Sequence, residues 1–180
     1  MTAELTDNAI QLLTVLICVA YSGFMTLKIR SRKWLLLTLF YISFGIGLIY
    51  WVLYIVLFDS TPRVFCVSEL SWTASYIFLA MRLTSDASAG TSGGKTRLAW
   101  ILPFFSFVMC VFFCLKGSYL ENIMMGLTLS ICGYCSAKRI ILSKCRRQFP
   151  DRYISLAVLF FYFSEYALWI SSYFQTSYHF

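Results

Sequence analysis

The sequence predicts an all-α integral membrane protein, a polytopic bundle of six transmembrane helices. Three observations lead to this class. Of the 180 residues, 59% are hydrophobic. Only 13% are charged, against about 25% in an ordinary soluble domain. The apolar residues gather in long runs separated by short polar or basic segments. A soluble globular domain is therefore excluded, and residues 1–180 are expected to form a single transmembrane domain.

The predicted spans follow from length. A hydrocarbon core about 30 Å thick needs about 20 helical residues at a rise of about 1.5 Å each. The runs that qualify are Ala9–Leu27, Trp34–Phe58, Val64–Leu83, Leu98–Leu115, Leu120–Leu142 and Tyr153–Phe174. The second run contains no charge and is the clearest span. The fifth is the weakest, because it spans only if Lys138 and Arg139 extend their side chains to the interface.

The segment Thr84–Lys95 is rich in Ser and Gly and predicts a flexible cytoplasmic linker between two sets of three helices. Two halves of three helices each must run in opposite directions through the membrane. Each half also ends in a helix with the string Trp-x-x-Ser-Tyr, at Trp72–Tyr76 and Trp169–Tyr173. Two interpretations stay open: an inverted repeat of the kind found in secondary transporters, and a chance match in a chain that is 19% aromatic.

The basic residues predict the orientation. The net charge is +7, and of the 15 Lys and Arg residues all but Arg63 and Lys116 lie between spans 1 and 2, spans 3 and 4, or spans 5 and 6. By the positive-inside rule these loops are cytoplasmic and both termini lie outside a cell membrane. No Lys or Arg precedes the first span, so we expect that span to be retained rather than cleaved as a signal peptide. The basicity thus indicates topology and no nucleic-acid partner.

The inventory of reactive residues excludes several chemistries. The single histidine, His179, lies next to the last residue. Haem with two histidine ligands, catalytic zinc and histidine-activated nucleophiles all need imidazoles inside the fold. We therefore expect no metal, no cofactor and no catalytic residue.

The cysteines offer two candidate pairs. Cys132 and Cys135 form a CxxC inside the fifth span, where close packing is the simpler interpretation than redox chemistry. Cys66 and Cys114 both lie near the outer ends of their spans, on the oxidising side. They are a candidate disulfide whose Cα separation the sequence does not give.

Two acidic residues, Glu69 and Glu165, are expected more than one turn inside a span. A carboxylate in hydrocarbon costs about 2.5–3.5 kcal/mol, so it should face the bundle interior with a partner, a cavity or a proton. Both fall in the outer half of the membrane, with aromatic residues on the same helix face. The predicted ligand site is Glu69, Trp72, Tyr76, Glu165, Trp169 and Tyr173.

A carboxylate among Trp and Tyr rings suits an organic cation, through charge pairing and contacts with ring faces. The first hypothesis is therefore a transporter or ligand-binding bundle for a small cationic solute, as a monomer or homo-oligomer in the lipid bilayer. The alternative is a sensor or interaction module that binds a partner membrane protein and has no solute path. A third hypothesis, an intramembrane enzyme with two carboxylates as acid and base, has weaker support because no nucleophile lies at a suitable spacing. The alternative to all three hypotheses is a structural role: each Glu is protonated and packs against a neighbouring helix, and the Trp and Tyr residues form an interfacial aromatic belt.

Overall fold

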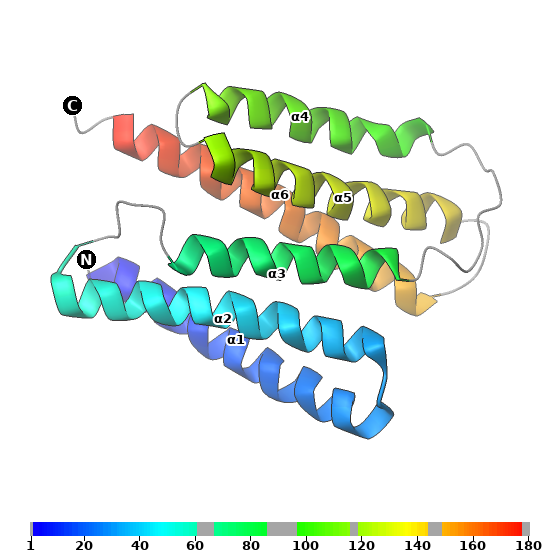
Figure 1. Ribbon diagram of the computed structural model, residues 1–180, viewed down its shortest axis with the longest axis horizontal. Coiled ribbons are helices and arrows are strands. Elements are labelled where there is room, and N and C mark those ends of the chain that lie inside the picture. The colour runs from blue at the N-terminus through cyan, green and yellow to red at the C-terminus, as the bar shows by residue number, and fades with distance from the viewer. Residues whose placement is uncertain (1, 61–66, 86–96, 116–118, 144–148, 178–180) are drawn as a thin grey trace.

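The computed structural model describes residues 2–60, 67–85, 97–115, 119–143 and 149–177, and in these ranges every regular element is helical (Figure 1). The helices are α1 (Thr2–Ile29), α2 (Arg32–Phe58), α3 (Val67–Thr84), α4 (Ile101–Cys114), α5 (Tyr119–Ser143) and α6 (Phe149–Ser177). A short 3-10 turn, η2 (Arg97–Trp100), leads into α4. The prediction of an all-α chain with six long helices is confirmed.

Only some of these helices are long and apolar enough to cross a membrane on their own. Within the described ranges, four segments are long and apolar enough to cross a membrane, namely Leu5–Ile29, Arg32–Phe58, Arg97–Cys114 and Arg152–Ser171. Helices α3 and α5 are not among them. The physical reason is their polarity: α3 contains Glu69, Arg82 and several Ser and Thr residues, and α5 contains Glu121, Lys138 and Arg139. The protein is therefore a helical membrane protein, and only four of the six expected spans meet this criterion on their own.

The helices lie side by side along one common direction (Figure 1). Within each half, the middle helix packs against both of its neighbours: α2 against α1 and α3, and α5 against α4 and α6. The halves are joined by packing of α3 against α5. Helix α5, one of the two more polar helices, is consequently the one with most helix neighbours.

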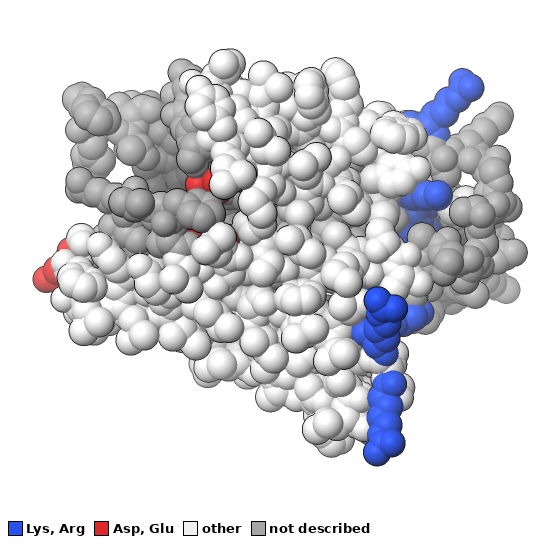
Figure 2. Space-filling model, viewed as in Figure 1, with Lys and Arg blue, Asp and Glu red and all other residues white. Residues whose placement is uncertain are grey.

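Charge is segregated along the helix axis (Figure 2). The described Lys and Arg residues lie at the end where α1 is connected to α2, and the described Asp and Glu side chains lie toward the opposite end. At the basic end, Arg139 of α5 donates a hydrogen bond to the backbone carbonyl of Leu83 in the last turn of α3. This contact satisfies a carbonyl that the end of α3 would otherwise leave without an intrahelical donor. The segregation is the pattern that the sequence predicted for cytoplasmic basic loops.

The connection between α1 and α2 is short and well defined. Arg30 adopts a left-handed conformation with φ 52°, and Ser31 then caps α2 by accepting a hydrogen bond from the backbone N–H of Lys33. At the other end of α2, Asp59 has φ 54° and its N–H donates to the carbonyl of Ile55 at 3.0 Å. These turns fix both ends of α2 and hence the position of its aromatic side chains.

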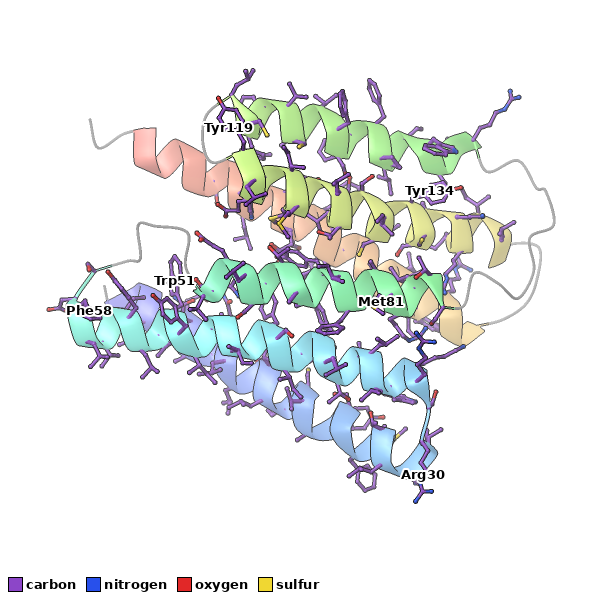
Figure 3. All side chains as sticks on the ribbon, viewed as in Figure 1. Arg30, Trp51, Phe58, Met81, Tyr119 and Tyr134 are labelled. Carbon is purple, nitrogen blue, oxygen red and sulfur yellow. The ribbon has the colours of Figure 1, made fainter. Side chains whose placement is uncertain are left out.

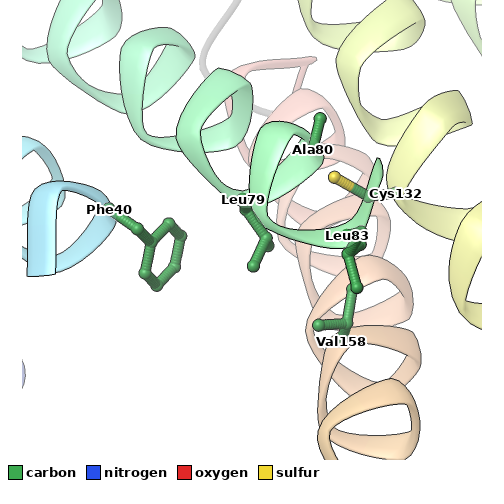
Figure 4. Packing of buried hydrophobic residues seen from close by; sticks show 6 residues of the cluster. All are labelled: Phe40, Leu79, Ala80, Leu83, Cys132 and Val158. Carbon is green, nitrogen blue, oxygen red and sulfur yellow. The ribbon is translucent and has the colours of Figure 1, made fainter. Parts of the chain in front are cut away.

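The interior contains two clusters of buried apolar residues. The first lies toward the basic end, and α2, α3, α5 and α6 contribute to it (Figure 4): Phe40, Leu79, Ala80, Leu83, Cys132 and Val158. The second cluster lies farther from the basic end, among α3, α4, α5 and α6, and is largely aromatic: Tyr76, Phe113, Met125, Leu129, Tyr162 and Tyr166. We call this second group the aromatic cluster.

Candidate functional site

The centre of the candidate site is a pair of buried side chains from the two halves of the molecule. Glu165 of α6 is 8% exposed and Tyr76 of α3 is 3% exposed. A side-chain hydrogen bond joins the Tyr76 hydroxyl to the Glu165 carboxyl group. Since α3 and α6 are not close backbone neighbours, the two long side chains bridge the space between them. The structure thus brings together two of the six residues predicted for the ligand site.

Tyr76 belongs to the aromatic cluster, so rings pack on one side of this pair. The ring of Phe161 lies 5.7 Å from that of Tyr76, and the ring of Tyr166 lies 5.0 Å from Tyr162 and 5.3 Å from Phe105. A buried carboxyl group in such surroundings is costly when charged unless a cation or strong hydrogen bonds compensate for the lost water. The described environment of Glu165 is therefore suited either to a protonated carboxyl or to a bound cation.

A second polar contact orders the same cluster. Tyr162 of α6 donates from its hydroxyl to the carbonyl of Leu102 at 3.0 Å and is 2.7 Å from the Ser106 hydroxyl of α4. Because a hydroxyl has one proton, Ser106 must be the donor to Tyr162. The Tyr162 ring also lies against Gly133 of α5, where an added Cβ would come within 3.0 Å of a ring carbon. Tyr162 is thereby fixed between α4 and α5, one turn from Glu165.

The two predicted tryptophans lie at the edges of the aromatic cluster. Trp72 of α3 stacks near Trp51, at 5.6 Å between ring centroids, and near Phe44, at 6.3 Å. Figure 3 shows Trp51 near the start of α3, at the end of the bundle far from Arg30. The Trp72 indole nitrogen is buried and, among the described residues, has no hydrogen-bond acceptor. Trp169 of α6 packs against Phe113 of α4 at 5.4 Å, so these rings border the cluster from different sides.

Glu69 is half-buried near the described start of α3. The expected span began at Val64, which placed Glu69 more than a turn inside it. The structure describes α3 from Val67 onward, and residues 61–66 lie outside the described residues. The expected depth of Glu69 therefore stays a prediction.

The remaining predicted residues are only partly described. The side chain of Tyr173 and the whole of Cys66 lie outside the described residues, so the Cys66–Cys114 pairing stays a prediction. Cys114 has its sulfur 3.9 Å from the carbonyl oxygen of Tyr119. Cys132 is fully buried in the first apolar cluster, with its thiol 3.8 Å from the carbonyl of Tyr76, as a packing role requires.

Sequence reasoning missed several residues of the site, among them Ser106 and Phe161. Ser106 is the one hydroxyl residue within the Phe-rich α4, and that isolation in an apolar helix was a usable signal. Phe161 carried no signal, because a Phe in an apolar span is ordinary.

Comparison of the chain with protein families, with curated proteins and with solved structures gives no match. The functional assignment therefore depends on the chemistry of the residues themselves.

Proposed function

We propose that the protein is a membrane-embedded binding bundle for a small organic cation, acting as a transporter, with Glu165 as the group that pairs with the cation. The observation that carries this proposal is the hydrogen bond between Glu165 and Tyr76 in the aromatic cluster. It joins the two halves of the molecule inside the bundle, where an unpaired charge is costly.

The chemistry of the exchange follows from the surroundings. A carboxylate buried among rings is stabilised by one positive charge, which a proton or a cation supplies. The cation also gains contacts with the faces of Tyr and Trp rings. Cation binding to Glu165 and protonation of Glu165 are then alternatives at one group, which is the basis for coupling a solute to a proton. Trp72 and Trp169 border the aromatic cluster from different sides. Glu69 and Tyr173 belong to the proposed path toward the acidic end.

The proposed topology includes all six helices as spans. Helices α3 and α5 cross the membrane inside the bundle, where apolar neighbours shield them from lipid. Their own hydropathy is not high enough to meet the requirement for a span. The basic end faces the cytoplasm of a plasma membrane, and both termini lie outside. Glu165 is then reached from the outer half, as the charge segregation in Figure 2 supports.

The test is ligand-dependent stability of the purified full chain in a neutral detergent. Tetraethylammonium and tetraphenylphosphonium serve as probe cations. We expect at least one of them to raise the thermal unfolding temperature of the wild type, and Glu165→Gln to abolish that rise while it keeps the shape of the side chain. Glu121→Gln, which changes an acidic group in the first turn of α5, is the matched control and should respond like the wild type.

Two results would contradict the proposal. One is a Glu165→Gln variant that responds to the cations as the wild type does. The other is the absence of any cation response together with a membrane protein that co-purifies in stoichiometric amount. The latter result would favour the interaction module.

A further inference from the structure

A cavity of about 580 Å³ lies on the basic side of the bundle, separate from the Glu165 pair. It opens between α2, α3 and α6, and α1 contributes one wall. Its lining is largely apolar, with Leu37, Phe40, Phe44 and Phe161 along its length, and its polar part includes Lys33 and Arg82. Its volume falls in the range of about 300–1,000 Å³ that is usual for sites that bind organic molecules.

The cavity exists because one seam of the bundle is open. Helices α3 and α5 join the two halves by close backbone packing, whereas among the described residues α2 and α6 have no such packing. They meet through rings: Phe161 of α6 lies 5.9 Å from Phe40 and 6.3 Å from Phe44 of α2. Ala157, on the same wall of α6, has a side chain too small to close the remaining space.

The length of the cavity matches one leaflet of a bilayer. Lys33 is in the first turn of α2, at the basic end of the bundle, and the helical rise places Phe44 about 16 Å farther along the axis. Half of a hydrocarbon core is about 15 Å thick. The lining therefore runs from the headgroup level to about the bilayer midplane, which is the depth that an acyl chain occupies.

The charged residues that line this cavity both lie at the basic end of the bundle. Lys33 is exposed, and Arg82 is buried in the last turn of α3 at the same end of the bundle. Figure 2 shows the basic residues gathered at that end. Each of these side chains also has a contact within the protein, so an anionic group would join an existing set of polar contacts. Among the residues that the structure describes, no Asp or Glu lines the cavity.

We propose that this cavity holds one anionic glycerophospholipid from the leaflet at the basic end. Its phosphate lies at Lys33 and Arg82, and one acyl chain lies along Leu37, Phe40 and Phe44 toward Phe161. The juxtaposition of two cations with an apolar channel one leaflet deep fits this amphiphile. A soluble anion would not use the channel, and an uncharged lipid would not use the cations. The inference uses residues other than Glu165 and holds whether or not the bundle transports a cation.

The experiment measures lipid retained by the full chain in dodecyl maltoside by native mass spectrometry. The two probes are dioleoyl phosphatidylglycerol and dioleoyl phosphatidylcholine, which have identical chains. We expect one phosphatidylglycerol to be retained under conditions that remove phosphatidylcholine. Lys33→Gln should weaken this binding about fivefold, the factor expected for one lysine at a membrane surface. Lys28→Gln, an exposed lysine at the end of α1 that does not line the cavity, should leave it unchanged.

A second pair of variants tests the acyl channel. Ala157→Trp fills the cavity and should abolish retention, whereas Ala167→Trp, at an exposed position of α6 outside the cavity, should not. The position of the chain is checked with phosphatidylglycerol brominated on its acyl chains, which quenches nearby indoles. Trp34 lines the cavity, so the brominated lipid should quench its fluorescence. Trp34→Phe should therefore lose this quenching, whereas Trp100→Phe should keep it.

The proposal is overturned if both lipids are retained equally, if Ala157→Trp binds like the wild type, or if Lys33→Gln and Lys28→Gln weaken binding to the same degree. None of these outcomes involves Glu165, so failure here leaves the cation proposal standing, and a failed cation test leaves this one standing.

Discussion

Gly47 is the residue that sets how closely α2 and α3 approach. A Cβ at this position would lie 2.6 Å from the Trp72 indole nitrogen and 3.1 Å from the backbone carbonyl of Ser68. The Trp72 ring has little freedom to move away, because Trp51 and Phe44 lie against it. The first of these contacts is too short for any real side chain, so the helices must separate or the ring must turn.

We expect Gly47→Ala to destabilise the protein by about 1–3 kcal/mol, the usual effect of overpacking a filled interior. Reversible unfolding in detergent measures this change. The matched control is Gly23→Ala, where the added Cβ would have an ordinary contact of 3.9 Å with Thr38. There the higher helix propensity of alanine should leave stability unchanged or raised. Equal effects of the two substitutions would show that the contact with Trp72 does not limit the approach of α2 and α3.

At the residue scale, the sequence could predict candidate site residues but not which residues of other helices they contact. The helical period placed Glu165 and Tyr76 on polar, aromatic faces of two different helices, and the structure joins them. The same reasoning placed Glu69 more than one turn inside a span beginning at Val64, and that depth stays a prediction because residues 61–66 lie outside the described residues. Periodicity identifies the face of a helix on which a residue lies; it does not identify the neighbouring helix, so the contact of Trp72 with Gly47 had no signal.

Helices α3 and α5 are built differently from the rest. Both lie in the join between the halves, and both are more polar than the four segments that meet the requirements for a span. In α3, Glu69 and Arg82 lie near the helix ends, where each costs less than the roughly 2.5–3.5 kcal/mol of a charge at the membrane centre. The stability of these helices in a bilayer therefore depends on their neighbours.

We expect isolated α3 and α5 to insert poorly into a membrane and isolated α2 to insert almost completely. Each helix is placed as a test segment in a host membrane protein whose glycosylation reports insertion. Replacing both Glu69 and Arg82 by Leu should make α3 insert efficiently, because it removes the two charges. Insertion of unmodified α3 and α5 as efficient as that of α2 would contradict this account.

The sequence predicts the presence of each helix better than it predicts the first and last residue of that helix. Long apolar runs bounded by charged residues or by Gly, Pro and Ser located all six helices. The limits differ where a helix extends beyond its apolar part: α1 begins at Thr2 rather than Ala9, because Glu4 and Asp7 suit the positive end of the helix dipole and continue the helix outside the hydrocarbon. Hydropathy locates the membrane portion of a helix, and capping determines its ends.

At the scale of the whole molecule, the number of crossings is testable at one position. If all six helices cross, the connection after α3 lies on the same side as the connection after α1. If only the four more apolar segments cross, the connection after α3 lies on the opposite side, while the C-terminus stays where it was. A reporter at the C-terminus alone therefore does not distinguish the two arrangements.

We expect a green fluorescent protein fused after Ser85 to be fluorescent, and alkaline phosphatase fused there to be inactive, since that point should be cytoplasmic. Fusions after Asp59 should give the opposite pattern and serve as the control. Phosphatase activity after Ser85 would mean that α3 does not cross the membrane in the shortened chain. The same pair of reporters inserted at Ser85 of the full chain then shows whether the later helices restore the crossing.

The open seam between α2 and α6 has a mechanical consequence. The halves are fastened by backbone packing along α3 and α5, while the far side is closed by Phe161 against Phe40 and Phe44. The described polar contacts that tie the halves together, from Glu165, Arg139 and Cys132, all end on α3. A body joined along one edge can pivot about that edge. A pivot about the α3–α5 pair would separate the ring contacts at the seam first and would leave the packing of α3 against α5 in place.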